Sequence, residues 1–210
     1  MNITIIGASA GVGLETVKRA LERNHQVTTI SRSPINLPEN DNLTCLKGSA
    51  TNRDDLVLSI ANADAVIVAL GTGKSMKATT LYSDFAWLLV DIQKEKSRQV
   101  PFIVLTGFGA GPSGAYLTLL MKLFFSLFLK KVYADKTRME EIVTQSALRW
   151  VIVRPGLLKD GQLTEKYRAQ TALYSGINIG SINRVDVADY MVKQAEQPTE
   201  LFKYPALSGE

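Results

Sequence analysis

Short runs of apolar, mostly β-branched residues recur along the chain, and helix-like stretches separate them. The runs cover residues 3–6, 26–30, 43–46, 65–70, 102–105 and 150–153. The runs are mainly apolar or β-branched, and such strands that alternate with helices are typical of a parallel sheet covered on both faces. We therefore expect an α/β protein whose ligand binds beyond the carboxyl ends of the strands.

The stretches between the runs carry apolar residues at helical spacing. Leu14, Val17 and Leu21 fall on one face of a helix expected over residues 14–23. Further helices are expected over residues 54–61, 80–96, 136–145 and 185–194. The pattern predicts one Rossmann-type, doubly wound domain over residues 1–210. Because the alternation weakens after residue 156, we assign residues 157–210 to a small C-terminal cap on the substrate side of the sheet.

Residues 109–131 are unusually apolar. Thr118, Lys122, Ser126 and Lys130 recur every four residues and form a narrow polar stripe, and leucine and phenylalanine cover the rest. Such a helix is expected to be buried in the fold, against a second subunit or over an apolar ligand, with attachment to a membrane surface as a further alternative. We favour packing in the core or as a lid, because the glycine-rich residues 107–114 precede it.

Composition narrows the class of protein. The 210 residues, 46% hydrophobic and 21% charged, suit one soluble domain, and the single Cys45 and single His25 exclude a disulfide framework and a Cys-based zinc site within one chain. The net charge of +4 is too small to predict nucleic-acid binding. Residues 115–129 are too few to span a bilayer and contain Lys122. We expect a cytoplasmic protein with no metal site, nucleic-acid partner or integral membrane segment.

The first apolar run leads directly into a glycine-rich loop, Gly7-Ala8-Ser9-Ala10-Gly11-Val12-Gly13, and then into a helix. Glycines let the backbone approach a pyrophosphate, and the unpaired N–H groups of the helix N-terminus stabilise its charge. The spacing is Gly-x-x-x-Gly-x-Gly, which differs from the Gly-x-Gly-x-x-Gly of the common dehydrogenases. Its place between the first strand and the first helix favours nucleotide binding over a merely structural turn.

The residues at the end of the second apolar run indicate whether the nucleotide is NAD or NADP. Arg32 stands 19 positions after Gly13, between Ser31 and Ser33, and no acidic residue accompanies it. A carboxylate at this place binds the ribose 2′-hydroxyl of NAD, whereas an arginine accommodates the 2′-phosphate of NADP. We therefore expect NADP(H), with NADPH preferred over NADH; an exposed arginine without a ligand is the alternative.

A third element is the buried run that ends in Leu70-Gly71-Thr72-Gly73. Its glycines allow a tight turn beside the nucleotide, with backbone groups facing a ribose. Lys74 follows and is expected to be a solvated surface residue.

Taken together, the loop over residues 7–13, Arg32, residues 64–73, Arg154-Pro155-Gly156 and Asp186-Val187-Ala188-Asp189 resemble the atypical short-chain dehydrogenase/reductases. The nearest type is the NAD(P)H-binding group that includes biliverdin-IXβ/flavin reductases and NmrA-like proteins. The resemblance spans nearly the whole chain. The chain departs from it at Ala10, where many members have glycine, and at Ser49-Ala50, where an aspartate often approaches the adenine.

The resemblance implies that residues 1–156 form the cofactor-binding core, with a pyrophosphate on the backbone of residues 9–13 and the 2′-phosphate at Arg32. It further implies a ribose near residues 70–73 and a nicotinamide near Thr106, Gly107 and residues 155–158. The expected cofactor-binding residues are Gly7, Ser9, Ala10, Gly11, Val12, Gly13, Ser31, Arg32, Ser33, Ser49, Ala50, Leu70, Gly71, Thr72, Gly73, Thr106, Lys136, Pro155 and Leu157.

Candidate catalytic residues are few. Standard short-chain dehydrogenases use a serine after the fifth strand and a Tyr-x-x-x-Lys pair, in which the lysine lowers the pKa of the tyrosine. Here Thr106 is the hydroxyl at the end of the fifth run, and Tyr133 is followed three positions later by Lys136, on the same helix face. Tyr133, Lys136 and Thr106 are the catalytic candidates, with Lys136 also a candidate ribose ligand; helix-surface positions are the alternative for Tyr133 and Lys136.

Transfer of hydride to a conjugated acceptor does not require a protein acid, because solvent can protonate the product. We therefore expect a reductase of the atypical short-chain type that passes hydride from NADPH to a flavin, a quinone or a similar planar molecule, as a monomer or homodimer. A non-catalytic NADP(H)-sensing regulator of the NmrA-like type is the main alternative. An epimerase or dehydratase that uses a bound cofactor is a third interpretation.

Overall fold

The computed structural model describes residues 1–73, 75, 77–95 and 99–210. Lys74, and Lys96 at the end of one expected helix, lie outside the described residues. Within the described part, the main sheet is built from β1 (Asn2–Ile6), β2 (Gln26–Ser31), β3 (Leu43–Lys47), β4 (Ala65–Val68), β5 (Pro101–Leu105), β6 (Arg149–Pro155), β8 (Tyr167–Gln170) and β10 (Ala206–Gly209).

The strand order is β3-β2-β1-β4-β5-β6-β10-β8, and a separate two-stranded sheet pairs β7 (Leu157–Lys159) with β9 (Ser181–Asn183). Neighbouring strands from β3 to β10 run parallel, and β8 pairs with β10 in the antiparallel direction. The chain order reverses beside β1, because β2 pairs with one of its edges and β4 with the other. Ligands of open α/β sheets bind at such a reversal.

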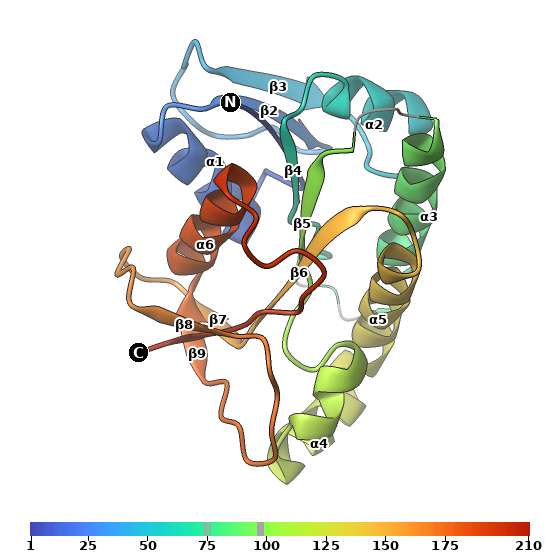
Figure 1. Cartoon of the computed structure of the whole chain (residues 1–210), viewed down its shortest axis with the longest axis vertical. Coiled ribbons are helices and arrows are strands. Elements are labelled where there is room, and N and C mark those ends of the chain that lie inside the picture. The colour runs from blue at the N-terminus through green and yellow to red at the C-terminus, as the bar shows by residue number, and fades with distance from the viewer. Residues whose placement is uncertain (74, 76, 96–98) are drawn as a thin grey trace.

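Helices cover both faces of the main sheet (Figure 1). α1 (Gly11–Glu22) and α6 (Arg184–Glu196) pack on one face, and α2 (Arg53–Ile60), α3 (Leu81–Lys94) and α5 (Lys130–Thr144) pack on the other. Successive strand residues alternate between two buried clusters, so that Ile5 faces α1 and α6 whereas Ile6 faces α2, α3 and α5. This double burial explains the apolar runs of the inner strands β1, β4, β5 and β6, and the arrangement confirms the Rossmann-type prediction.

Residues 157–210, which we expected to form a cap, also contribute to the main layers. α6 covers one face of the sheet, and β8 and β10 extend its edge. Residues 171–180 form a loop that lies at the same end of the molecule as α4 (Leu119–Phe124) in Figure 1. The division at residue 156 into core and cap stays a prediction.

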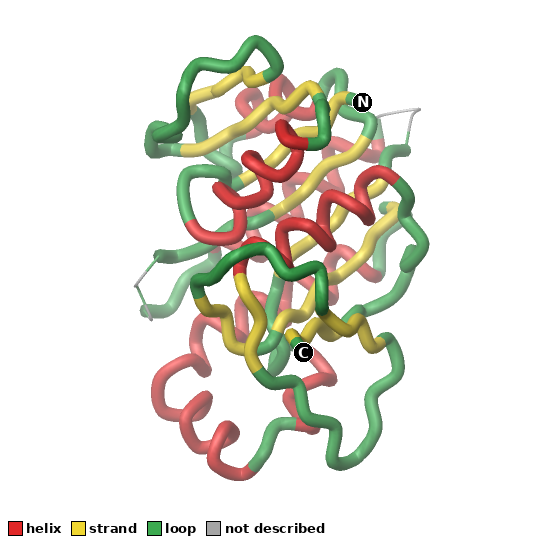
Figure 2. The backbone as a smooth tube through the Cα atoms, turned by 90° about the vertical axis from the view of Figure 1, so that its left-hand side faces the viewer, coloured by secondary structure: helices red, strands yellow, loops and turns green. Residues whose placement is uncertain are grey.

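The apolar segment over residues 109–131 differs from what we expected. It contains a 3₁₀ turn, η1 (Gly111–Tyr116), then α4, then a π-helical turn, η2 (Phe125–Leu129), which continues into α5. Leu119 is 86% exposed and Leu120 is 77% exposed, so the prediction that this helix packs in the core is wrong for its outer face. The segment projects beyond the end of the sheet, where no layer covers its outer face in the views of Figures 1 and 2.

The inner face of this segment is anchored. The ring of Phe125 lies 4.6 Å from the ring of Tyr133, centre to centre, and contacts the backbone at Gly109. Within the described ranges, no helix is both long enough and apolar enough to cross a membrane.

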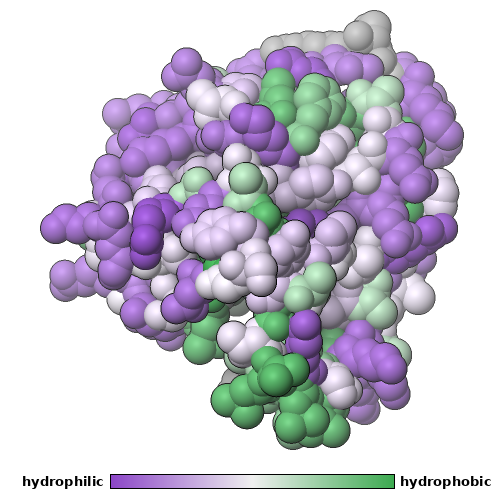
Figure 3. Space-filling view, turned by 60° about the horizontal axis from the view of Figure 1, so that its bottom comes forward, coloured by the Kyte–Doolittle hydropathy of each residue, from purple (hydrophilic) through white to green (hydrophobic). Residues whose placement is uncertain are grey.

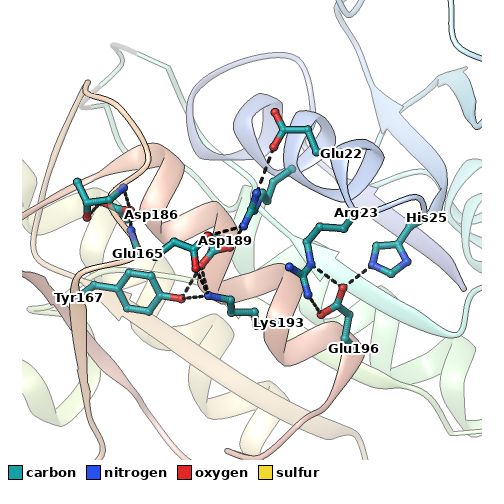
Figure 4. Close-up of polar contacts among 11 residues, drawn as sticks. Glu22, Arg23, His25, Glu165, Tyr167, Asp186, Asp189, Lys193 and Glu196 are labelled. Carbon is teal, nitrogen blue, oxygen red and sulfur yellow. Dashed lines mark hydrogen bonds and ion pairs between the residues drawn. The ribbon is translucent and has the colours of Figure 1, made fainter.

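α1 and α6 are held together by a network of ion pairs, drawn in Figure 4. Asp189 is fully buried. It accepts a hydrogen bond from Arg19 at 2.8 Å and forms an ion pair with Lys193 at 2.7 Å. Just beyond the same, C-terminal end of α1, Glu196 accepts a hydrogen bond from Arg23 at 2.6 Å and contacts the His25 ring at 2.7 Å. The aspartate-containing motif that begins α6 therefore serves packing of the fold.

The pKa values of the two carboxyl groups reflect these contacts. Burial alone would raise the pKa of Asp189, but hydrogen bonds from Lys193, Tyr167 and Arg19 outweigh it and lower the pKa below its usual value. The hydrogen bond from Arg23 lowers the pKa of Glu196 in the same direction. Both carboxylates therefore stabilise the fold while they are charged.

Candidate functional site

The glycine-rich loop lies at the chain-order reversal of the sheet. The Gly7 N–H donates to the Ile30 carbonyl at 3.0 Å, and the Ala69 N–H donates to the Ile6 carbonyl at 2.8 Å. The loop is thereby held between the carboxyl ends of β2 and β4. This is the expected position for a nucleotide that crosses the top of the sheet.

Gly13 and Gly11 of the loop are required for different structural reasons. A side chain at Gly13 would collide with the carbonyl of Gly7, so glycine here allows α1 to pack closely on β1. Gly11 has a φ of +57°, which favours glycine, and the space beside its Cα is open apart from the Arg184 Nε, 4.0 Å from where a Cβ would lie. A cradle of this kind leaves room for a phosphate against the backbone.

The N-terminus of α1 offers donors to that cradle. The preceding residue, Ala10, makes no side-chain cap, and the first turn of the helix has no acidic residue. The first N–H groups of a helix have no partner within it and carry partial positive charge. The loop and this helix end therefore fit a pyrophosphate, in agreement with the open space beside Gly11.

Arg32 follows directly after β2 and is exposed. Within the described part of the chain its guanidinium makes no hydrogen bond or ion pair, so its donors are available to a ligand. The Ser31 hydroxyl donates to the Ser33 carbonyl at 2.6 Å, which holds the turn around Arg32. This arrangement fits a phosphate group on the ribose that a nucleotide would place at the end of β2.

Ser49 and Ala50 lie beside the same strand end. The Gly48 N–H donates to the Ser31 carbonyl at 3.1 Å, which brings the end of β3 next to the end of β2. The Ser49 N–H is occupied by Asp55 at 2.8 Å, and Ala50 is buried. A ligand here would therefore meet the Ser49 side chain rather than its backbone donor.

The turn over residues 70–73 leaves β4 beside the glycine-rich loop. Leu70 lies against Gly7, since its Cα is 3.0 Å from where a Gly7 Cβ would lie. The Thr72 hydroxyl donates to the Ser75 carbonyl at 2.9 Å and also contacts Tyr82 of α3. These contacts fix the turn, so its backbone faces the site from a defined position.

The ends of β5 and β6 lie side by side next to this turn. The Thr106 N–H donates to the Val153 carbonyl at 2.9 Å, and the Phe108 N–H donates to the Pro155 carbonyl at 2.8 Å. Leu157 begins β7 with a side chain that is 71% exposed. Thr106, Gly107 and residues 155–158, near which the resemblance predicts the nicotinamide, thus belong to neighbouring strand ends.

The three catalytic candidates also lie together. Lys136 Nζ donates to the Thr106 carbonyl at 2.7 Å. The Tyr133 hydroxyl lies against Gly107, 2.6 Å from where a Cβ would be. The Lys136 ammonium is 5.1 Å from the centre of the Tyr133 ring and 5.4 Å from that of Tyr82, so two aromatic faces surround it.

The pKa values of Tyr133 and Lys136 do not favour Tyr133 as a catalytic proton donor. Burial raises the pKa of Tyr133 to about 12, and the charges of Tyr82 and Glu140 add to the rise. Burial lowers the pKa of Lys136 to about 8, while Glu140 opposes the shift. The ammonium lies over the ring and binds a carbonyl, so it does not lower the pKa of the tyrosine as in the Tyr-x-x-x-Lys arrangement.

The Thr106 hydroxyl is directed into the protein. It donates to Glu140 Oε1 at 2.7 Å, and both side chains are 3% exposed. Glu140 in turn accepts from the Arg154 guanidinium at 2.6 and 3.1 Å, and Arg154 stacks on Tyr204 with 4.1 Å between its guanidinium carbon and the ring centre. In this arrangement Thr106 faces the site with its backbone, and the buried ion pair supports the ends of β5 and β6.

Sequence reasoning missed Glu140, Tyr82 and Arg184. Arg184 begins α6, approaches Gly11 of the glycine-rich loop and forms an ion pair with Asp160 at 2.7 Å. No local pattern marks it, because its neighbour Gly11 lies far away in the chain. Glu140 and Tyr82 each lie on an amphipathic helix. A polar side chain on the apolar face of such a helix is the sequence signal that could have identified them.

Comparison with known proteins agrees with this geometry. A family model described as NAD(P)H-binding matches residues 7–198. ChuY, an anaerobillin reductase from Escherichia coli O157:H7, is 21% identical and aligns with a TM-score of 0.77 over 100% of this chain and 97% of its own. A wide-type short-chain dehydrogenase/reductase from Veillonella parvula, in complex with NADP, is 19% identical, with a TM-score of 0.80 over 99% of this chain and 94% of its own.

A curated relative, a 3-beta-hydroxysteroid dehydrogenase from Mycolicibacterium neoaurum, is 34% identical over 64 residues, which are 30% of this chain and 18% of that protein. The match thus spans less than a fifth of that relative. The two solved structures share the fold over nearly their whole lengths, and the family model extends from the glycine-rich loop to the end of α6. The chain belongs to the NAD(P)H-binding family and has the Rossmann-type fold of the atypical short-chain dehydrogenase/reductase-like proteins.

Proposed function

We propose that this protein is an NADPH-dependent reductase whose acceptor is a planar conjugated molecule such as a flavin or a quinone. Bound NADPH would supply the hydride, and the protein would hold the cofactor and orient the acceptor. The observation that carries the proposal is the pairing of a preformed nucleotide cradle with a Tyr133–Lys136 arrangement that supplies no strong acid.

The cofactor would be held by backbone and cationic groups. The donors at the start of α1 would bind the pyrophosphate, and Arg184 is close enough to Gly11 to add positive charge there. Arg32, which has no protein partner among the described residues, would bind the 2′-phosphate. Lys136 would reach the ribose on the nicotinamide side, where it already lies beside Thr106.

The acceptor class follows from the groups around the expected nicotinamide position. Reduction of a simple ketone needs a proton donor in the transition state, and Tyr133 with a pKa of about 12 is a poor one. A flavin or quinone delocalises the added charge and takes its proton from solvent. The rings of Phe125 and Tyr133, both partly exposed, lie next to this region and suit contact with a flat molecule.

An acceptor panel tests the proposal. NADPH consumption would be followed with riboflavin, FMN and menadione, and with cyclohexanone as a non-conjugated control. We expect turnover with at least one conjugated acceptor and none with cyclohexanone. No turnover across the conjugated acceptors, or turnover confined to cyclohexanone, would contradict the proposal.

The same Tyr133–Lys136 arrangement also suits a protein that binds NADP(H) without turning it over. A sensor of this kind must distinguish the oxidised from the reduced cofactor, because a ligand shifts an equilibrium only by its differential affinity. Calorimetric titration of NADP⁺ and NADPH separates the two functions. Affinities at least about tenfold apart, combined with no turnover in the panel, would favour the sensor.

A further inference from the structure

An apolar surface patch lies at the end of the molecule that carries α4 (Figure 3). We call it the α4 patch; its most exposed apolar side chains are Leu119, Leu120, Leu123, Phe124, Leu127 and Phe128. All six belong to α4 or η2 and lie within ten residues of one another. Exposed apolar residues scattered singly need no explanation, but a contiguous patch on a soluble fold marks an interaction surface.

The charged residues of the segment that carries the α4 patch are all positive. Residues 109–134 contain Lys122, Lys130 and Lys131 and no aspartate or glutamate. All three lysines are exposed, and none has an ion-pair partner among the described residues. The adjacent loop over residues 171–180 contains no charged residue, and its Tyr174 is 60% exposed. An apolar helix with lysines at its borders and a tyrosine nearby matches the residue preferences of the membrane–water interface.

The loop and the helix form one end of the molecule. Leu173 and Ile179 of the loop pack in the same small cluster as Tyr116 and Leu117, which immediately precede α4. On the inner side, Phe125 is fixed against Tyr133 and Gly109. The patch is thus attached to the fold on one side and turned outward on the other, as a docking surface requires.

A second copy of the chain suits this surface less well. A two-fold contact through the α4 patch brings the same residues of both copies together. Each copy would bring Lys122, Lys130 and Lys131 to such a contact, and residues 109–134 hold no carboxylate to compensate them. An anionic lipid surface offers both an apolar layer for the leucines and phenylalanines and negative charge for the lysines.

We propose that the α4 patch docks the protein on anionic lipid surfaces, with the helix lying in the plane of the interface. The inference does not depend on the reductase activity. α4 and η2 together are far shorter than a bilayer-spanning helix, so the docking is peripheral. Lys122, Lys130 and Lys131 would face the headgroups.

Vesicle sedimentation of the intact protein tests the inference. We expect binding to vesicles of phosphatidylcholine mixed with phosphatidylglycerol, and at least about tenfold weaker binding to phosphatidylcholine alone. Combined substitution of Leu119→Ser, Leu120→Ser and Leu123→Ser should weaken binding by at least about tenfold, since each removes apolar area from the interface. The matched control is Leu58→Ser, which removes a leucine that is 64% exposed on α2 and should leave binding unchanged.

Two further measurements complete the test. Substitution of Lys122→Gln, Lys130→Gln and Lys131→Gln should abolish most of the preference for phosphatidylglycerol, at about fivefold per lysine. A Leu120→Trp variant should show a blue-shifted emission with anionic vesicles, which reports entry of this position into the apolar layer. Absence of binding to anionic vesicles, or a concentration-dependent dimer that the three leucine substitutions dissolve in ultracentrifugation, would overturn the inference.

Discussion

The preference for NADPH can be tested at Arg32, because this side chain is exposed and none of the described residues binds its guanidinium. A hydrogen bond to a charged group contributes about 1.5–3 kcal/mol. Its loss in Arg32→Ala corresponds to about 10- to 150-fold weaker NADPH binding. Arg32→Asp adds repulsion from the 2′-phosphate and should weaken NADPH binding further. NADH lacks that phosphate, so its affinity should stay within about twofold.

Calorimetric titration of both nucleotides into both variants measures these changes. Arg168→Asp on β8 is the matched control, because Arg168 is also exposed, has no partner among the described residues and lies on the opposite edge of the sheet. The Arg32 effect should shrink as salt is added, since the pair is solvent-exposed. An unchanged NADPH affinity in Arg32→Asp, or an equal loss for NADH, would refute the assignment of Arg32 to the 2′-phosphate.

Three further predictions concern the packing and the site. Asp189→Asn should lower the free energy of unfolding in urea by about 3 kcal/mol at neutral pH, whereas Glu22→Gln, at the exposed end of the same network, should change it by less than about 0.5 kcal/mol. Because folding lowers the pKa values of Asp189 and Glu196, the stability that these carboxylates contribute is complete above about pH 4.5 and disappears as the pH falls through the lowered values. A difference in unfolding free energy between wild type and Asp189→Asn that does not shrink in acid would contradict this. Gly13→Ala should lower stability by about 1–3 kcal/mol and weaken NADPH binding, while Gly180→Ala, which meets open space, should be neutral in the same urea and binding assays. Since the pKa of Lys136 is about 8, kcat/KM for NADPH should fall as the pH rises through that value and the lysine loses its charge, and Lys136→Met should remove the inflection from the pH–rate profile.

Local patterns were sufficient to predict the layers and the nucleotide side of the fold. Each of the six runs is a strand of the main sheet, and the strands buried on both faces, such as β4 and β5, are the continuously apolar ones. The glycine-rich loop also follows from local requirements, since Gly11 needs a positive φ and Gly13 needs space against Gly7. The strands β7 to β10 escaped prediction because each has only three or four residues; β7, β8 and β9 are partly exposed, whereas β10 is buried but contains Ser208 and Gly209.

Contacts between distant residues decided what the sequence could not predict. Thr106 stands where a catalytic hydroxyl was expected, yet its hydroxyl donates a hydrogen bond to Glu140, 34 positions later, and is thereby directed inward. The spacing of Tyr133 and Lys136 correctly indicated a shared location, but the direction of the Tyr133 pKa shift depends on burial beneath Phe125 and beside Gly107. Hydrophobicity alone favoured burial of residues 119–129, whereas the position of this segment beyond the sheet leaves it exposed.

The central claim is that the cofactor performs the chemistry and the protein supplies no acid. The most direct test is kcat for NADPH oxidation by Tyr133→Phe with the best conjugated acceptor. A phenylalanine keeps the contact with Phe125 and removes only the hydroxyl. We predict a kcat within about threefold of wild type, because a proton donor with a raised pKa contributes little. A general acid contributes about 10²- to 10⁴-fold, so a decrease in that range would contradict the account.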